Sequence, residues 1–304
     1  MGSDSPSAKP NERPAHQVRV SGFWMDRTPV TNAQYEAFVA ATGYLTTAER
    51  PPKWESLKVQ LPNGTPKPLD DVLVPGAMVF VGTEQPVDLN DYSQWWRYMP
   101  GANWRQPQGR GSSIAGMADN PVVQVSYEDA LAYAHWVGKR LPTEAEWEFA
   151  ARGGLEQATY AWGNEFAPQG RKMANIWEGS AQPFPVVRPQ TGSSHGTSRV
   201  CAFPTNGYGL CDMVGNTWQW VADWYRADAF SSGAHGSELI DPQGPDDSYD
   251  PDDPGVPAQA PKRVIRGGSF LCSEEYCVSY RPSARRGNDP YTSMSHIGFR
   301  LVSR

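Results

Sequence analysis

Glycine and proline interrupt this chain so often that long helices and long strands are excluded. Its 304 residues include 29 Gly and 28 Pro. Proline breaks the interior of a helix or of a central strand, and glycine weakens both. The 12 Trp can fill a core between short segments, because each indole buries a large apolar area. The sequence therefore predicts an irregular, loop-rich fold, and it excludes a helix bundle.

Charge and hydropathy narrow the choice of partner. The chain carries 27 Lys and Arg against 33 Asp and Glu, a net charge of −6. Binding to nucleic acid or to an anionic membrane needs a positive surface, so neither is expected as a partner. The sequence has no run of about 20 apolar residues and no signal-peptide pattern, which predicts a cytoplasmic chain. The expected partner is a small molecule or a protein segment.

Three capping-box patterns predict helices, because in each a Ser or Thr has Gln, Asp or Glu three residues later. The predicted N-caps are Thr31, Ser126 and Thr143, and the helices are expected to end at Gly43, Gly138 and Gly153. The first should bury Tyr35, Phe38 and Val39, the second should bury Leu131, Ala134 and Trp136, and the third carries Trp147 and Phe149. No further helix is expected after Gly154.

Short strands and long loops are expected elsewhere. The predicted strands lie within residues 18–30, 122–125, 263–270 and 298–302. Residues 50–116 are predicted to form a long excursion with a few short strands, not a separate domain. The Asp- and Pro-rich residues 241–261 are interpreted as a solvated loop and not as a calcium site.

Cys272 and Cys277 are the leading candidates for chemistry. A separation of five places two side chains on opposite faces of a strand, so the residues between them must bend if the thiols are to meet. Gly267 and Gly268 make such irregular backbone plausible. Three states remain open, namely unlinked thiols, a disulfide, and a metal or redox site. If the thiols meet, two soft thiolates without further Cys or His ligands suit two-coordinate Cu(I) better than tetrahedral Zn²⁺.

The other two cysteines, Cys201 and Cys211, are predicted to be buried free thiols without a function. An unpaired buried Cys behaves as a small apolar residue, and nothing in their surroundings suggests chemistry.

Residues 212–220 offer a carboxylate, an amide and several carbonyls, which could bind a hard cation. The alternative is that Trp218 and Trp220 are core residues and that Asp212 is a turn residue. None of the 5 His forms a pair with metal-ligand spacing, and the sequence has no phosphate loop and no nucleophile elbow. His296 is kept as a candidate because it lies in the same C-terminal stretch as the cysteine pair.

Segments spread over nearly the whole chain resemble the formylglycine-generating enzymes, also called sulfatase-modifying factors. The matching segments are 22–26, 29–32, 120–123, Gly-Lys-Arg-Leu-Pro-Thr-Glu-Ala-Glu-Trp-Glu at 138–148, 162–164, 175–177, 206–210, 215–216 with Trp218, Arg-Gly-Gly-Ser at 266–269, and 298–300. The resemblance implies a single irregular α+β domain over residues 1–304, related to the C-type lectins. Members usually begin with a strand that ends in Met-Gly-Ser, so Met1-Gly2-Ser3 is interpreted as the end of a truncated first strand.

The implied reaction is the oxidation by O2 of a cysteine, in a Cys-x-Pro-x-Arg segment of a sulfatase, to Cα-formylglycine. Cys272 and Cys277 stand where the family has its two copper-binding thiols, so Cu(I) is the implied cofactor. The other implied site residues are Ser269 as the active-site serine, Trp218 in the pocket on the oxygen side, Tyr276 beside the second thiol, and His296 in a polar, hydrogen-bonding role.

The resemblance also implies calcium (Ca²⁺). One site would use Asp212, the carbonyls of Gly215 and Thr217, and Gln219. Its acidic residue has moved from the last position to the first, so the charge offered to calcium stays at −1 and the site is expected to be retained. A less complete second site would use Asn175 and the Ile176 carbonyl, with the family's Asp aligned near Gly192.

Two departures from the family pattern concern the substrate-facing loop. Ser273 stands where the family usually has His, and residues 288–292 read Asn-Asp-Pro-Tyr-Thr in place of Asn-Thr-Pro-Asp-Ser. They bear on peptide specificity, and they keep open an alternative function as a non-catalytic module that binds a peptide or a glycan on the same fold. An iron-dependent oxidase for sulfur attachment ranks last, because that chemistry needs a His-rich helical domain upstream.

Overall fold

A four-stranded sheet forms the centre of the fold, and its strands come from distant parts of the chain. The computed structural model describes residues 1–179, 183–187, 196–232 and 238–304. The strand order is β8-β7-β5-β9, with β5 at Trp218–Trp224, β7 at Arg263–Arg266, β8 at Arg285–Asn288 and β9 at Ile297–Phe299. β7 is antiparallel to both of its neighbours, whereas β5 and β9 are parallel.

Three two-stranded sheets join other distant segments. They are β1 (Val18–Arg19) with β6 (Leu239–Ile240), β2 (Trp24–Met25) with β10 (Val302–Ser303), and β3 (Gly76–Phe80) with β4 (Trp96–Pro100). Val18 pairs with Leu239, and Met25 pairs with Val302. The N-terminal residues are thus held in place by strands from the second half of the chain.

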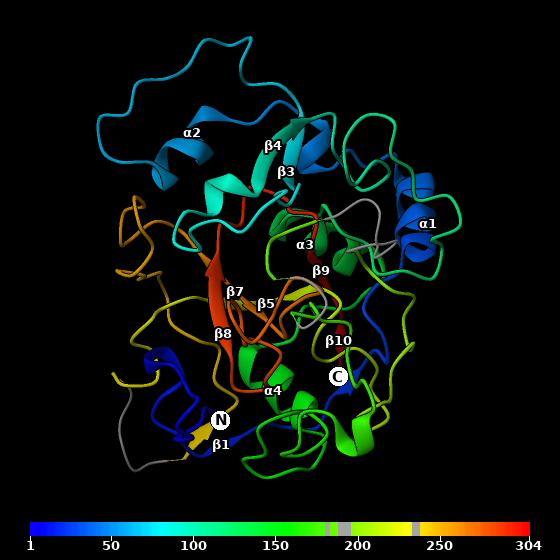
Figure 1. Cartoon of the computed structure of the whole chain (residues 1–304), viewed down its shortest axis with the longest axis vertical. Coiled ribbons are helices and arrows are strands. Elements are labelled where there is room, and N and C mark those ends of the chain that lie inside the picture. The colour runs from blue at the N-terminus through cyan, green and yellow to red at the C-terminus, as the bar shows by residue number, and fades with distance from the viewer. Residues whose placement is uncertain (180–182, 188–195, 233–237) are drawn as a thin grey trace.

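The three predicted helices are confirmed, each with its capping box. They are α1 (Asn32–Thr42), α3 (Tyr127–Trp136) and α4 (Glu144–Arg152). The remaining helical elements are short, namely α2 (Trp54–Leu57) and 3-10 turns at Pro10–Glu12, Thr47–Glu49, Lys58–Gln60, Tyr92–Gln94 and Pro168–Gly170. Figure 1 shows α4 below the central sheet and the β3–β4 hairpin above it. In the described part of the chain, no helix has the length and apolar content needed to cross a membrane.

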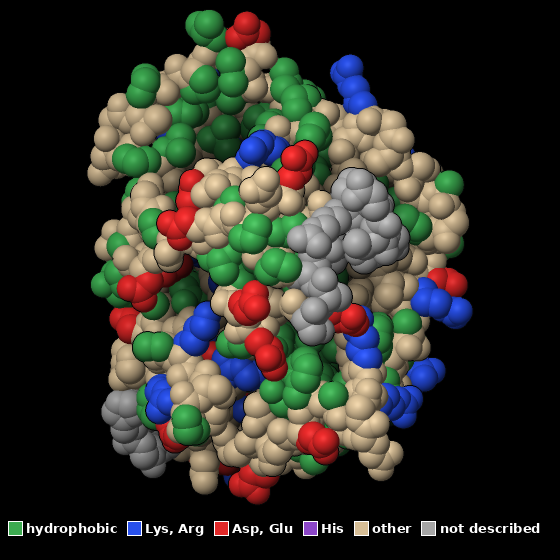
Figure 2. Space-filling view, viewed as in Figure 1, with side chains coloured by type: hydrophobic (Ala, Val, Ile, Leu, Met, Phe, Trp, Pro, Cys, Tyr) green, Lys and Arg blue, Asp and Glu red, His purple; other side chains and the backbone are tan. Residues whose placement is uncertain are grey.

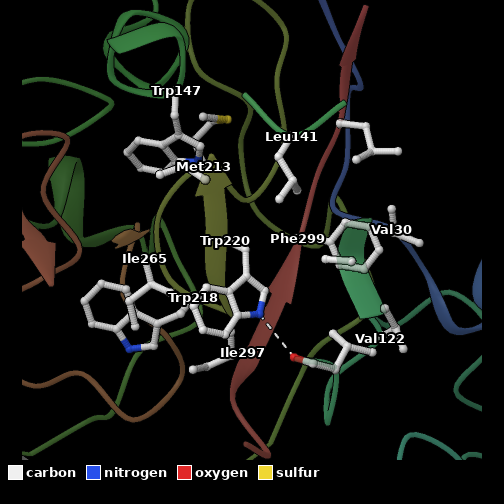
Figure 3. Packing of buried hydrophobic residues seen from close by; sticks show 14 of the residues in the cluster. Val30, Val122, Leu141, Trp147, Met213, Trp218, Trp220, Ile265, Ile297 and Phe299 are labelled. Carbon is white, nitrogen blue, oxygen red and sulfur yellow. Dashed lines mark hydrogen bonds between the residues drawn. The ribbon is translucent and has the colours of Figure 1, made fainter. Parts of the chain in front are cut away.

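Tryptophan side chains fill the core, as predicted. Trp147, Trp218 and Trp220 are all buried and belong to one cluster with Phe299 (Figure 3). The buried indole of Trp220 donates from Nε1 to the carbonyl of Val125 at 3.1 Å. Its one polar atom is therefore satisfied inside the core.

The buried faces of the helices agree with the prediction for α1 and only in part for α3. Tyr35, Phe38 and Val39 of α1 are buried, and so is Ala134 of α3. Leu131 is partly buried and Trp136 is 43% exposed, whereas α3 also buries Ala130 and Tyr133. Trp136 lies against the rim of the core, where its ring contacts Phe38 and Tyr133. Phe149 of α4 is also half exposed, with its ring against those of Phe23 and Tyr208.

The strand predicted at 122–125 is wrong, although the segment is buried. Gln124 has φ of 59°, in the left-handed region, which breaks an extended strand. Val122 instead bonds to the carbonyl of Val30, and Gln124 bonds to that of Met294. The apolar run reflects burial and not membership of a sheet.

The other predicted strands are shorter than expected. Within 18–30 the structure has β1 and β2, and within 263–270 the strand ends at Arg266 because Gly267 and Gly268 have φ of 91° and 69°. Residues 50–116 contain the β3–β4 hairpin and the single-turn α2. Residues 241–261 contain neither helix nor strand, but Asp250 and Asp253 both pair with the buried ammonium of Lys262, so the loop is anchored.

Candidate functional site

The turn that follows β7 brings Cys272 and Cys277 together. The two residues form a disulfide, with their Cα atoms 4.5 Å apart. The bend that the spacing demands is made by two backbone bonds, from Cys272 N–H to the Ser269 carbonyl and from Cys277 N–H to the Ser273 carbonyl, both at 3.0 Å. Both cysteines are buried. We call residues 267–277 the thiol turn.

Two glycines allow the thiol turn to leave the sheet. A Cβ on Gly267 would lie 2.6 Å from the Met213 carbonyl oxygen, and one on Gly268 would lie 3.1 Å from Cys272 Sγ. The left-handed backbone at both positions also favours glycine. The sequence Gly-Gly before the first thiol is therefore required both by backbone conformation and by space.

Ser269 lies directly beside the first sulfur. Its backbone N–H points to Cys272 Sγ at 3.5 Å, and its hydroxyl accepts a hydrogen bond from the N–H of Leu271 at 3.2 Å. The hydroxyl thus stabilises the turn, whereas the N–H is placed to stabilise negative charge on the sulfur.

Aromatic rings pack around Tyr276, which lies between the two cysteines in the sequence. Its ring stacks on Phe184 with centroids 4.5 Å apart and meets Trp95 edge-on at 5.5 Å. Trp95 and Phe184 are buried and come from loops distant in sequence. Sequence reasoning missed both residues, and the only available signal was the aromatic density of residues 95–98.

Figure 2 shows many hydrophobic side chains on the upper part of the surface, where the loops around α2 lie.

Trp218 and His296 form a second group, at the adjoining ends of β5 and β9. The N–H of Trp218 donates to the His296 carbonyl at 2.9 Å. The His296 ring lies 4.7 Å from that of Trp96, and its Nδ1 has no hydrogen-bond partner among the described residues. Burial, together with the nearby Arg286, lowers the pKa of His296 to about 3. The imidazole is therefore neutral near pH 7.

Asn216 connects the two groups. Its carbonyl accepts a hydrogen bond from Phe270 N–H of the thiol turn at 3.1 Å, and Gly215 N–H bonds to the Gly267 carbonyl at 2.8 Å. Asn216 is fully buried, with φ of 62°. The structure thus places the start of β5, where Trp218 lies, beside the turn that carries Cys272, Ser269 and Tyr276. The importance of Asn216 was missed, because the Gly215-Asn216 pair on its own indicates only a turn.

A buried ion network fixes the end of β7. The Arg266 guanidinium bonds to Glu144 and Glu148 of α4, each at 2.7 Å, and Arg285 of β8 also bonds to Glu144. Burial raises the pKa of Glu144, but Arg285 and Arg266 outweigh it, so the pKa is lowered and the carboxylate stays ionised. The residue before the thiol turn is thereby held against α4.

The residues expected to bind calcium lie close together but do not fit that ion. Gln219 is fully buried, and its Oε1 already accepts hydrogen bonds from Arg300 Nε at 2.6 Å and Trp147 Nε1 at 3.0 Å. Its Nε2 donates to the Asp212 carbonyl at 2.8 Å. A carboxylate oxygen of Asp212 accepts from Cys201 N–H, also at 2.8 Å. Gln219 therefore has no oxygen left to offer a cation.

At the second expected calcium site, the Asn175 amide is held by protein contacts through its nitrogen. Asn175 donates from Nδ2 to the carbonyl of Gly196 and to Asn216 Oδ1. Ile176 follows it in the chain, but Gly192, where the acidic partner was aligned, lies outside the described residues. Within the described ranges, no three or more His, Cys, Asp or Glu side chains are grouped to hold a metal ion.

The prediction of free thiols at Cys201 and Cys211 is wrong, because the two form a disulfide with an S–S distance of 2.00 Å. The loop between them folds back so that their Cα atoms lie 5.0 Å apart, within the range that a disulfide needs. The sequence around each Cys contains no pattern that predicts a loop bringing Cys201 back to Cys211.

Comparisons with known proteins agree with this arrangement. The family model described as "Sulfatase-modifying factor enzyme 1-like domain" matches residues 1–304. The chain is 46% identical to the formylglycine-generating enzyme of Mycobacterium tuberculosis, over 97% of this chain and 91% of that protein. It is 35% identical to the mouse (Mus musculus) protein named inactive C-alpha-formylglycine-generating enzyme 2, over 100% and 82%. Among solved structures, PvdO from Pseudomonas aeruginosa has a TM-score of 0.58 at 24% identity, over 99% of this chain and 89% of that one, which shows a shared fold.

Proposed function

The chain belongs to the sulfatase-modifying factor family of formylglycine-generating enzymes, and from this premise we propose that it converts a cysteine of a sulfatase to Cα-formylglycine with O2. The observation that carries the proposal is the thiol turn, which brings two buried cysteines together beside Ser269. The proposed substrate is a Cys-x-Pro-x-Arg segment, in a nascent or unfolded sulfatase chain.

We propose that Cys272 and Cys277, once reduced, hold Cu(I). Two buried soft sulfurs suit this ion, since among the described residues no three His, Cys, Asp or Glu side chains are grouped to hold a metal ion, and the absent side chain of Gly268 leaves room at Cys272 Sγ. Bound Cu(I) would supply one-electron chemistry toward O2. The disulfide must first be opened, so the enzyme is expected to need a thiol reductant.

The surrounding residues have separate roles in this proposal. Ser269 N–H stabilises negative charge on Cys272 Sγ, and the stacked Tyr276 and Phe184 rings exclude water from the thiols. The neutral His296 offers an unpaired Nδ1 as a hydrogen-bond partner without adding positive charge to the site. Trp218 contributes a buried apolar ring to the cluster that contains both cysteines.

The test is turnover of a peptide. The reduced protein is loaded with Cu(I), given a Cys-x-Pro-x-Arg peptide in air, and assayed for the aldehyde by mass and by hydrazone trapping. Conversion that is lost in both Cys272→Ser and Cys277→Ser, but kept in the double variant Cys201→Ser/Cys211→Ser, supports the proposal. Full conversion by either single variant would exclude the paired-thiol mechanism.

The alternative is a non-catalytic module that binds the same kind of segment. The resemblance to a relative named inactive favours it, as does Ser273 in the thiol turn. Tight peptide binding without conversion, and without Cu(I) binding by both thiols, would select this alternative.

A further inference from the structure

Arg300 is a buried cation held almost entirely by neutral oxygens. Its guanidinium is fully buried, and its hydrogen-bond acceptors are the carbonyls of Asp26, Arg27, Cys211 and Asp212 and the amide oxygen of Gln219, at distances from 2.6 to 3.4 Å. These acceptors come from three separate segments of the chain. A ring of carbonyl and amide oxygens around one positive charge is the kind of environment in which proteins hold calcium.

The charge of Arg300 persists at neutral pH. Burial lowers the pKa of Arg300 to about 10, and the attraction of Asp212 and Asp26 works against that lowering. The group therefore remains a cation throughout the physiological range. Any divalent ion bound to Gln219 Oε1 would lie next to this guanidinium and would be repelled by it.

Gln219 makes the exclusion specific, because a carboxamide has only one oxygen. That oxygen accepts the Arg300 Nε–H, and the other end of the amide is an NH2 group that donates to the Asp212 carbonyl. A glutamate at this position would keep one oxygen for Arg300 and would turn a second oxygen toward the carbonyls of residues 212–217.

We infer that Arg300, with the amide of Gln219, takes the structural place of a divalent cation here, so that this turn folds without calcium. The inference is independent of the proposed function. Arg300 fixes the carbonyls of Cys211 and Asp212, and the turn that follows supplies Gly215 and Asn216 to the thiol turn. The guanidinium thus acts as a positioning group and touches neither thiol.

The experiment compares calcium binding and melting temperature for the wild type and Gln219→Glu. Each protein is dialysed against chelator and its metal content is measured. Each is then melted in EGTA and in millimolar Ca²⁺. We expect the wild type to contain no stoichiometric calcium and to melt within about 1 °C under the two conditions. We expect Gln219→Glu to melt several degrees higher in Ca²⁺ than in EGTA, because its carboxylate offsets the charge of Arg300 and, with Asp212, supplies the negative charge that a divalent ion needs.

Gln219→Asn is the matched control, since it alters the side chain without adding a charge and should not respond to Ca²⁺. A wild type that retains one calcium through dialysis, or that melts several degrees lower in EGTA, would overturn the inference. A Gln219→Glu protein that ignores Ca²⁺ would also overturn it, because the amide would then not be what excludes the ion. Neither the metal content nor the melting temperature measures turnover, so the result does not depend on whether the proposed function is correct.

Discussion

Replacing Asn216 tests whether one buried amide joins the two halves of the site. Its Oδ1 accepts hydrogen bonds from Ser198 N–H at 2.9 Å and Asn175 Nδ2 at 3.2 Å, and its Nδ2 donates to the Ser198 carbonyl at 3.1 Å. Each such bond contributes about 1 kcal/mol, so Asn216→Ala should lose about 3 kcal/mol through these contacts. Alanine at φ of 62° adds about 1–2 kcal/mol of backbone strain.

The matched variant is Asn216→Gly, which loses the same bonds but tolerates the left-handed backbone. We expect the free energy of unfolding to fall by about 4–5 kcal/mol for Ala and by about 1 kcal/mol less for Gly. Guanidinium chloride titrations followed by tryptophan fluorescence measure both values. Peptide turnover should fall with them, because the Asn216 side chain fixes the backbone whose carbonyl holds Phe270 N–H. An Ala variant within about 1 kcal/mol of the wild type would refute the reasoning, as would a Gly variant less stable than the Ala variant.

Three further changes have expected outcomes of their own. The double variant Cys201→Ser/Cys211→Ser should lose about 2–3 kcal/mol of unfolding free energy, because the disulfide closes a short loop, and an unchanged denaturation midpoint without reductant would contradict this. His296 has its pKa lowered to about 3, so between that value and its ordinary value near 6.5 the unfolded chain binds a proton that the folded chain does not. Stability should therefore fall by up to about 1.4 kcal/mol per pH unit on acidification through this range, and His296→Asn should flatten the slope in melts from pH 7 to 4. Gly268→Ala should cost about 2 kcal/mol or more and should abolish turnover, whereas Gly22→Ala, at a site without a neighbour within 4 Å, should be nearly silent in both assays.

Local signals predicted the helices well, because a capping box is satisfied within four consecutive residues. Thr31, Ser126 and Thr143 each cap the helix they were expected to cap. The irregular, loop-rich α+β fold was also predicted correctly, and the structure and the comparison with PvdO confirm it. Both the density of glycine and proline and the resemblance to a known family predicted this fold.

Long-range contacts were beyond the sequence patterns. Nothing in the local sequence shows that Cys201 returns to Cys211, or that Trp95 and Phe184 cover Tyr276. The strand predicted at 122–125 failed because burial and sheet pairing produce the same apolar run. The cytoplasmic location stays a prediction, and the 201–211 disulfide is a bond more typical of oxidising compartments.

The thiol turn was placed correctly in the chain, but its state had been left open between three alternatives. Deciding between them needed the backbone path set by Gly267 and Gly268, which spacing alone does not give. The fit of the expected calcium site depends on a similar detail, because the sequence shows Gln219 but not that Arg300 already binds its oxygen.

The position of β9 has a consequence for biosynthesis. β9 lies beside β5 and pairs Ile297 with Trp218, so one edge of the central sheet is closed by residues near the end of the chain. A nascent chain that stops before His296 already contains both cysteines of the thiol turn and β7, yet it lacks His296 and β9. Contacts of such long sequence separation form slowly. The site is therefore expected to assemble only after synthesis has passed β9, because no one local segment contains all of its parts.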